Sequence, residues 1–318
     1  MHSLGSAIVV AVVALLVSPW AAGQSYPSKT VRVITAWPAG GLTDVAGRIV
    51  FQKISENVGQ QFVVDNRAGA NGIIGADLVA KSPPDGYTLM VHSTSHISNA
   101  WMYKKLPYDT LKDFTPIGLI VAQTGLIVVH PSMPVRSVKE LVALAKARPD
   151  QILYGSAGNG SFSHLAMALL DSMAGTKMVH VPYKGGGPAS TGFLSGETQV
   201  LVSSPAAAVS QLKANRMRLI AVTSDQRLSQ FPNTPTVAEA GVPGYEFRAW
   251  VGVFGPAGVP KAIVDRVNSE IKKVLESRDN KLDEFEPWYM TPEQTAARMV
   301  ADYNKYGKLI KLTGARAE

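Results

Sequence analysis

Three glycine-rich turns are the segments of this sequence best suited to binding chemistry. They cover residues 38–41, 155–161 and 183–187, and each follows an apolar run and precedes a helical pattern. Such turns bring backbone N–H groups to the start of a helix, where the helix dipole favours an anion. A plainer alternative stays open, because glycine also serves simply to make tight turns. Three turns in equivalent places favour a binding site made of two opposed parts, or jaws, that close on one anion.

Other chemistries find little support in the motifs. The second turn reads GxxGxG, which differs from the GxGxxG of dinucleotide sites, and no GxxxxGK[ST] occurs. Ser161 and His164 are close in sequence, but the GxSxG of a nucleophile elbow is absent. His92 and His96 are four residues apart without a carboxylate beside them, so we expect hydrogen-bonded histidines and no metal or other cofactor. An α/β enzyme, a hydrolase or transferase acting on a small anion, remains the alternative, and a scaffold that only binds partners is a third.

Two residues beside the first turn have structural interpretations of their own. Asp44 falls in the first turn of the following helix, where the dipole favours a carboxylate, and we expect it to brace the turn. Trp37 precedes the glycines and is either a core residue or an aromatic wall of a cleft.

The elements that must position these turns alternate between strand and helix, which predicts an α/β fold with largely parallel sheets. Strands are expected at residues 31–35, 61–64, 87–91, 126–129, 151–154, 178–181, 200–202, 218–222 and 250–254. Helices are expected at residues 43–58, 72–81, 137–147, 164–174, 188–194, 206–214 and 261–276, and from Thr291 onward. Ser137 and Thr291 begin their helices with capping-box sequences, so the last helix is predicted to be ordered.

The length of 318 residues suggests two domains, yet no flexible linker separates two halves. We therefore expect the chain to cross between lobes as strands, within residues 117–129 and 245–254, which would leave a hinged cleft. The expected first lobe comprises residues 24–122 and 248–318, and the second comprises residues 123–247.

Composition narrows the partners and the compartment. The net charge of +7 is spread thinly, without a stripe of basic and aromatic residues, so nucleic acid is not expected as a partner. The sequence has no cysteine, which excludes disulfides, thiol chemistry and a lipid-anchored N-terminal cysteine.

The first 28 residues carry no Lys, Arg, Asp or Glu, and residues 7–17 form an apolar run too short to span a bilayer. With small residues at 21–23, this pattern predicts a signal peptide over residues 1–23, cleaved near Gly23/Gln24, and export to the periplasm.

Several long motifs resemble the tripartite tricarboxylate transporter receptor family, also called Bug or TctC-type periplasmic solute-binding proteins. They include AWPAGGLTDVAGR, VVDNRAGANGIIGADLVAKSPPDGYTL, YGSAGNGSFSHLA, VPYKGGGPA and PTVAEAGVPGYEFRAWVGVFGPAGVP. The resemblance runs from about Tyr26 to the final helix. It implies a type II periplasmic-binding-protein fold, with two α/β lobes around a cleft, and no enzymatic activity. It also implies capture of a small carboxylate (a di- or tricarboxylate, an amino acid or an aromatic acid) for a membrane permease, by a receptor that we expect to be a monomer.

The resemblance also implies which residues bind, through backbone N–H groups and hydroxyls rather than arginine. The first jaw would comprise Trp37, Pro38, Ala39, Gly40, Gly41 and Asp44, with Ser93, Thr94 and Ser95 as hydroxyl donors. The second would comprise Ser156, Ala157, Gly158, Asn159, Gly160, Ser161, His164, Tyr183, Lys184, Gly185 and Gly186, with Ser203 and Ser204.

The sequence departs from the family pattern at three positions and in the length of one segment. Trp37 stands where the family usually has Phe, and Gly192 and Gln199 stand where it usually has Asp. The segment before Trp288 is shorter than usual. These departures bear on which carboxylate is bound rather than on the fold.

Overall fold

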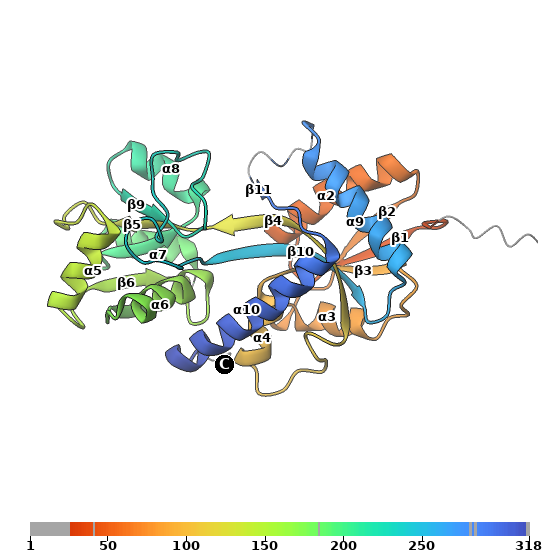
Figure 1. Ribbon diagram of the computed structural model, residues 1–318, viewed down its shortest axis with the longest axis horizontal. Helices are drawn as coiled ribbons and strands as arrows, with labels where there is room; N and C mark the ends of the chain where they lie inside the picture. The colour runs from red at the N-terminus through yellow and green to blue at the C-terminus, as the bar shows by residue number, and fades with distance from the viewer. Residues whose placement is uncertain (1–25, 41, 184, 280–281, 283–284, 316–318) are drawn as a thin grey trace, which may run out of the picture.

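The computed structural model describes residues 26–40, 42–183, 185–279, 282 and 285–315. The predicted signal peptide and its cleavage site, Gly41 and Lys184 lie outside the described residues. The chain forms two α/β lobes, each with its own sheet, side by side along the long axis of the molecule (Figure 1).

The first sheet has the strand order β11-β4-β10-β3-β1-β2. Its parallel part is β1 (Val31–Thr35), β2 (Phe62–Asn66) and β3 (Thr88–Ser93), as alternation of strands and helices predicts. The other strands, β4 (Phe114–Thr124), β10 (Arg248–Pro256) and β11 (Glu286–Pro287), pair in antiparallel fashion. The parallel strands place their carboxyl ends, and the turns that follow them, at one edge of the sheet.

The second sheet has the order β7-β6-β8-β5-β9. Here β6 (Leu153–Ser156) pairs in parallel with both β7 (Val179–Pro182) and β8 (Val200–Ser203). Strand β5 (Leu126–Val129) runs antiparallel to β8 and to β9 (Arg218–Val222). Three strand-to-helix turns therefore end at the same edge, which is where open α/β sheets bind ligands.

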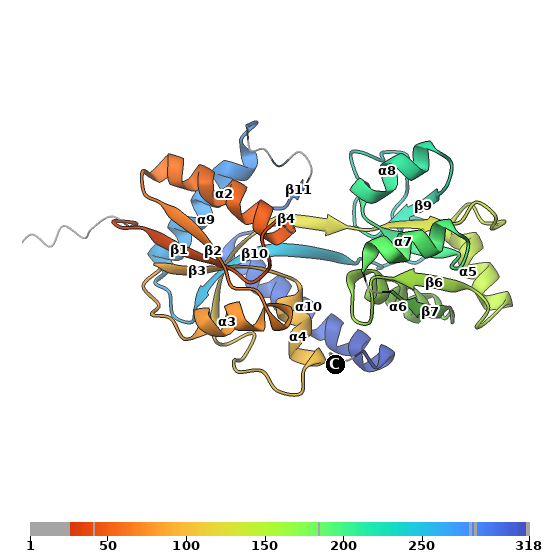
Figure 2. The same cartoon turned by 180° about the vertical axis from the view of Figure 1, so that it is seen from behind.

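Two strands carry the chain between the lobes (Figures 1 and 2). Strand β4 leaves the first sheet and continues through Gly125 into β5, and β10 returns beside it. The N–H of Gly125 donates to Thr223 Oγ1 over 2.8 Å, and the N–H of Phe247 donates to the Thr223 carbonyl, also over 2.8 Å. The predicted crossing is thus present, with Thr223 joining the outgoing and returning strands.

Helices cover both faces of each sheet. On the first sheet, α2 (Leu42–Val58) and α9 (Lys261–Glu276) cover one face, and η1 (Ala70–Gly72), α3 (Ile73–Ala80) and α4 (Ser95–Met102) lie on the other. On the second sheet, α5 (Val138–Ala147) and α6 (Phe162–Ala174) cover one face, and α7 (Gly186–Leu194) and α8 (Pro205–Lys213) cover the opposite face.

The last helix, α10 (Pro292–Thr313), ties the two lobes together. Thr291 and Gln294 form the predicted capping box at its start. Its buried residues Tyr306, Leu309 and Ile310 belong to one apolar cluster that includes Ile97 of the first lobe and Leu165 of the second. Among the described residues, no helix combines the length and hydrophobicity needed to cross a membrane.

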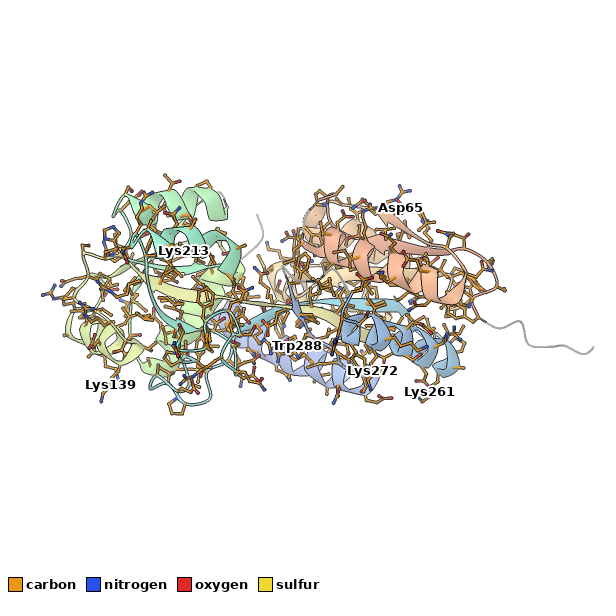
Figure 3. All side chains as sticks on the ribbon, turned by 90° about the horizontal axis from the view of Figure 1, so that it is seen from above. Asp65, Lys139, Lys213, Lys261, Lys272 and Trp288 are labelled. Atoms are coloured by element: carbon orange, nitrogen blue, oxygen red, sulfur yellow. The ribbon has the colours of Figure 1, made fainter. Side chains whose placement is uncertain are left out.

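Positive charge is distributed over the outside of both lobes. Figure 3 labels Lys139 and Lys213 on the second lobe and Lys261 and Lys272 on α9 of the first, and all four are exposed.

Candidate ligand-binding site

One pocket of about 290 Å³ lies in the second lobe, where three helices begin. These are α6, α7 and α8, which follow the parallel strands β6, β7 and β8 (Figure 2). The pocket also reaches the end of the crossing strand β4. Its lining residues are Gln123, Thr124, Ala157, Phe162, Ser163, Gly186, Gly187, Ala189, Ser190, Leu201, Val202, Ser203, Ser204 and Ala207.

The electrostatic character of this pocket comes from backbone rather than from charged side chains. Among the described residues that line it, none is charged at neutral pH. Each of the three helices begins beside this pocket, so the positive ends of their dipoles lie around the same space. The floor includes Phe162, Leu201 and Val202, which are apolar. The arrangement suits an anionic group attached to an uncharged body.

The glycine turn before α6 does not leave its own amides bare. The N–H groups of Ala157, Gly158 and Gly160 donate to Ser163 Oγ, Ser156 Oγ and His164 Nδ1, at 3.0, 3.1 and 3.0 Å. The prediction that glycine exposes these amides is therefore wrong. The first residues of α6, Phe162 and Ser163, lie on the pocket wall instead, and a helix has no internal acceptor for the N–H groups at these positions.

The start of α8 is arranged in a similar way. Ser204 is its N-cap, and its hydroxyl accepts the N–H of Ala207 over 3.3 Å. The adjacent Ser203 hydroxyl is oriented toward the Ser204 carbonyl. At α7 the N-cap is Gly185, with φ of +113° and no side-chain cap, so the N–H groups of Gly186 and Gly187 open on the pocket directly.

Three predicted residues of the second lobe lie behind the pocket rather than on its wall. Ser156 is fully buried, and its hydroxyl lies 2.5 Å from Nε2 of His180. His164 is also buried, and its pKa is lowered to about 4 by burial and by the neighbouring His180. Although Ser156 and His180 have the atoms of a nucleophile and a base, Ser156 has no exposed surface from which to reach a substrate.

Tyr183 is the third of these residues. A Cβ atom added to Gly192 would lie 2.2 Å from the Tyr183 hydroxyl, so the ring occupies the space that a side chain on α7 would need. Gln199, the other departure from the family pattern, precedes β8 and accepts the N–H of Leu153 through its side chain. It therefore lies at the opposite end of β8 from the pocket. Asn159 is exposed on the turn before α6 and does not line the pocket.

The predicted first jaw is held by Asp44, whose bracing role is confirmed. Its carboxylate accepts the N–H of Gly40 over 2.9 Å, Nε of Arg48 over 3.0 Å and Nδ2 of Asn66 over 2.8 Å. Burial alone would raise the pKa of Asp44. These hydrogen bonds together lower the pKa by more than burial raises it, so the net shift is downward. Asn66 also donates to the carbonyl of Trp37 over 2.9 Å. Asp44 is thus used to hold the turn, and its charge is paired with Arg48.

The remaining residues of the first jaw lie apart from the pocket in this structure. Pro38 and Ala39 are exposed on their turn, and the half-buried Trp37 meets the His92 ring edge to face at 6.1 Å. Ser93 and Ser95 share a hydrogen bond of 2.7 Å between their hydroxyls.

Thr94 and the two histidines have structural roles. The N–H of Trp250 donates to the buried hydroxyl of Thr94 over 2.7 Å, so Thr94 anchors β10 rather than facing a cleft. His92 and His96 are fully buried, and aromatic rings, including Phe114, surround His96. No cluster of three or more metal-ligating side chains occurs in the described part of the chain.

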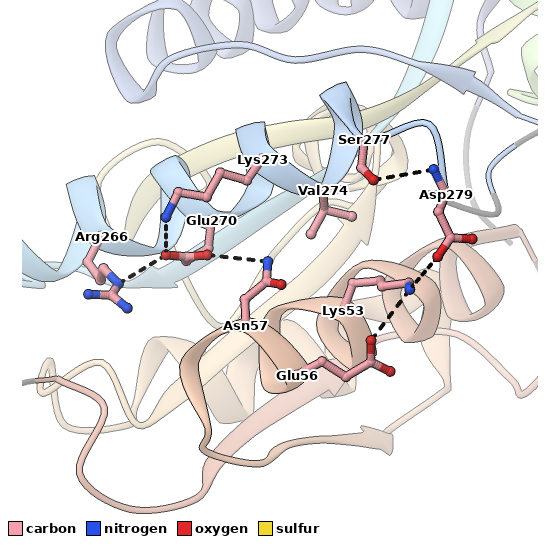
Figure 4. A pocket seen from close by; sticks show the side chains of 9 residues that line it. All are labelled: Lys53, Glu56, Asn57, Arg266, Glu270, Lys273, Val274, Ser277 and Asp279. Atoms are coloured by element: carbon pink, nitrogen blue, oxygen red, sulfur yellow. Dashed lines mark hydrogen bonds and ion pairs between the residues drawn. The ribbon is translucent and has the colours of Figure 1, made fainter.

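A larger groove, of about 510 Å³, lies on the outside of the first lobe between α2 and α9 (Figure 4). Its charged side chains pair with one another. Glu270 accepts hydrogen bonds from Lys273 at 2.8 Å and Asn57 at 3.5 Å, and Lys53 binds Asp279 at 3.0 Å. Since its charges of both signs already have partners, this groove presents no seat for a small anion.

Sequence reasoning identified the turns but missed much of the wall. Of the predicted residues, Ala157, Gly186, Ser203 and Ser204 line the pocket. The missed lining residues with polar side chains are Gln123, Thr124, Ser163 and Ser190. Ser163 could have been found from its place in the first turn of α6, while Gln123 and Thr124 reach the pocket only because β4 crosses between the lobes.

Comparison with known proteins gives consistent matches. The family model described as "Tripartite tricarboxylate transporter family receptor" matches residues 46–315. A relative from Pseudomonas sp. strain P51, the "UPF0065 protein in tcbD-tcbE intergenic region", is 39% identical over 257 residues, covering 80% of this chain and 76% of that protein.

Two solved structures resemble the whole fold. The Rhodopseudomonas palustris protein Rpa4515 with adipate is 35% identical, with a TM-score of 0.73, and the match covers 92% of this chain and 99% of that one. A TctC solute-binding protein from Polaromonas with no ligand is 29% identical, with a TM-score of 0.82, and the match covers 90% of this chain and 99% of that one.

Proposed function

The chain belongs to the tripartite tricarboxylate transporter receptor family, a family of periplasmic solute-binding receptors, and from this premise we propose that it captures a small carboxylate in the pocket of its second lobe. The resemblance inferred from its motifs is confirmed, as is the two-lobed α/β fold. The family is one of transport receptors rather than enzymes, and we propose that this chain likewise binds its ligand without converting it.

The observation that carries the proposal is the convergence of α6, α7 and α8 on one pocket whose described lining residues are all uncharged. Free N–H groups and helix dipoles favour a carboxylate without requiring an arginine. The relative that is 35% identical was solved with adipate, which makes aliphatic dicarboxylates the first ligands to test.

We propose that the ligand is enclosed by rotation of the lobes about the strands that cross at Gly125 and Phe247. Closure would bring the turn at residues 37–44 toward the pocket, and contacts to both lobes would favour the closed form.

The finer predictions complete this proposal. The lobes would divide at residues 24–122 with 248–318, and 123–247. The receptor would be exported with cleavage near Gly23/Gln24, act as a monomer, and deliver its ligand to the membrane permease of the transporter. The residues of the turn at 37–41, with Gly41, and of the second-lobe turns, with Lys184, would form the two jaws.

Isothermal titration calorimetry against adipate, malate, citrate, glutamate and benzoate tests the proposal. We expect saturable 1:1 binding of at least one of them, with a smaller radius of gyration by X-ray scattering once it is bound. The proposal fails if none binds, or if nuclear magnetic resonance shows that the bound compound is chemically converted.

A further inference from the structure

The glycine turn before α6 is held at two points by side chains from behind. Gly158 and Gly160 both have positive φ, at +122° and +71°, which L side chains rarely adopt. The N–H of Gly158 donates to Ser156 Oγ, and the N–H of Gly160 donates to His164 Nδ1. The turn leads directly into Phe162 and Ser163 on the pocket wall. The placement of that wall therefore depends on these two attachments, together with the hydrogen bond from the Ala157 N–H to Ser163 Oγ.

The first attachment depends on His180 of β7, a residue that does not line the pocket. Its Nε2 lies 2.5 Å from Ser156 Oγ, which among the described residues also has the N–H and carbonyl of Gly158 in hydrogen-bond reach, at 3.1 and 3.2 Å. With an unprotonated Nε2, His180 accepts the hydroxyl hydrogen, which directs the lone pairs of Ser156 toward the Gly158 N–H.

The second attachment depends on the same residue. The rings of His164 and His180 stack face to face, with centroids 3.8 Å apart and planes 4° from parallel. This stack fixes the plane of His164 with Nδ1 toward Gly160, so Nδ1 must be the acceptor and carry no proton.

The surroundings keep both imidazoles neutral. Burial lowers the pKa of His180, and burial together with the neighbouring ring lowers that of His164. From β6 the Tyr154 ring packs on His180 at 5.1 Å, and on α6 Asp171 is engaged with Thr176 and the N–H of Met178. In the described chain no carboxylate forms an ion pair with either imidazole.

We propose that His180 is a positioning residue for the ligand seat, acting on Gly158 through Ser156 and on Gly160 through His164. The inference rests on the proposed function only in taking the α6 wall as part of the seat. His180, whose side chain lies outside the pocket, would thus hold the pocket's backbone in its binding conformation.

A set of variants separates this role from general support of the fold. His180→Phe keeps a flat ring for the stack but removes the acceptor, whereas His180→Gln keeps an acceptor for Ser156. Using the tightest probe among adipate, malate, citrate, glutamate and benzoate, we expect about tenfold weaker binding by His180→Phe and recovery to within about threefold of the wild type by His180→Gln.

The decisive comparison uses Ser156→Ala as the background. With no hydroxyl left to orient, the advantage of Gln over Phe at position 180 should disappear, and any remaining difference should favour Phe, which keeps the ring stacked on His164. The surface variant His130→Asn, on the same lobe but away from the pocket, controls for loss of a histidine and should bind as the wild type does.

Hydrogen exchange of the peptide 155–163 gives a readout that needs no ligand. We expect at least about tenfold faster exchange in His180→Phe, and no further increase when Ser156→Ala is added. Unchanged exchange in His180→Phe, or an advantage of Gln over Phe that persists without the Ser156 hydroxyl, would overturn the inference. If the wild type bound none of the five probes, the proposed function would fail while the exchange result still decided the role of His180.

Discussion

The start of α8 allows the anionic character of the ligand to be tested with two nearly identical variants. Ala207 lines the pocket, is exposed, and follows the N-cap Ser204 by three residues. Replacing it with Glu or Gln gives the sequence S-x-x-E or S-x-x-Q, both of which favour a capping box. Both variants should therefore keep α8 at least as stable as in the wild type, but only Ala207→Glu adds a negative charge to the pocket.

The expected loss of affinity follows from the size of the pocket. If the two charges lie about 7 Å apart, an effective dielectric constant of about 20 gives a repulsion of about 2.4 kcal/mol. Screening at physiological salt, with a Debye length of about 8 Å, reduces this to about 1 kcal/mol if solvent reaches the pair. Ala207→Glu should thus bind the carboxylate about 5- to 50-fold more weakly than Ala207→Gln does.

Calorimetry of both variants with the same carboxylate, at low and at physiological salt, provides the measurement. The difference between Glu and Gln should shrink as salt is added, and both melting temperatures should equal or slightly exceed that of the wild type. Equal affinities, or tighter binding by Ala207→Glu, would refute the idea that the helix starts seat the ligand's negative charge.

Three further predictions concern residues that support the two jaws. Asp44→Asn should lower the free energy of unfolding by about 1.5–3 kcal/mol at pH 7. Because the folded pKa of Asp44 is lowered, this difference in denaturant unfolding should shrink as the pH falls below about 4 and vanish once the pH is below the folded pKa, and a difference that does not shrink with falling pH would contradict it. Gly192→Ala should destabilise by about 1–3 kcal/mol, since its Cβ would meet the Tyr183 hydroxyl, and a double-mutant cycle with Tyr183→Ala should recover part of that loss; additive effects would argue against the contact. Thr291→Ala should cost about 1 kcal/mol in urea unfolding, and an unchanged midpoint would mean that α10 does not depend on its cap.

Regular elements were largely predictable because their signals are local. The bounds of β1, β5, β9 and α9 were predicted to the residue, from alternating or continuous apolar runs and from helical spacing. Ser137 and Thr291 were also recognised as helix starts, and both side chains cap as expected. In these segments the nearest neighbours in sequence already favour the observed structure.

Helix α4 was not predicted, and the reason is physical. Its sequence, SHISNAWM, has no clear apolar periodicity, and its polar residues are typical of a loop. In the structure, however, His96 and Asn99 are fully buried. The helix is fixed by partners far along the chain, since Asn99 donates to the Asn71 carbonyl and Trp101 donates to the Tyr303 carbonyl. Tertiary contacts of this kind leave no mark on the local pattern.

The candidate site was likewise predictable in part. The turns that lead to it could be read from glycine and serine placement, because strand-to-helix turns in a parallel sheet meet at one edge. The direction of individual side chains could not. Thr94 is directed to β10, Tyr183 covers Gly192, and His164 supports the turn from beneath. Each of these orientations is decided by a residue that is distant in sequence or on another element.

The pairing of Asp44 explains how a carboxylate can stand beside an intended anion site. Left alone, it would repel an incoming carboxylate at the start of α2. Its charge is instead matched by Arg48, and its oxygens also accept hydrogen bonds from Gly40 and Asn66, so the turn carries no net charge toward the cleft. The residues that the structure describes on the wall of the second-lobe pocket are likewise uncharged. A ligand held by the described residues of this pocket forms no ion pair with it, so its release avoids the cost of separating a buried charge from its partner.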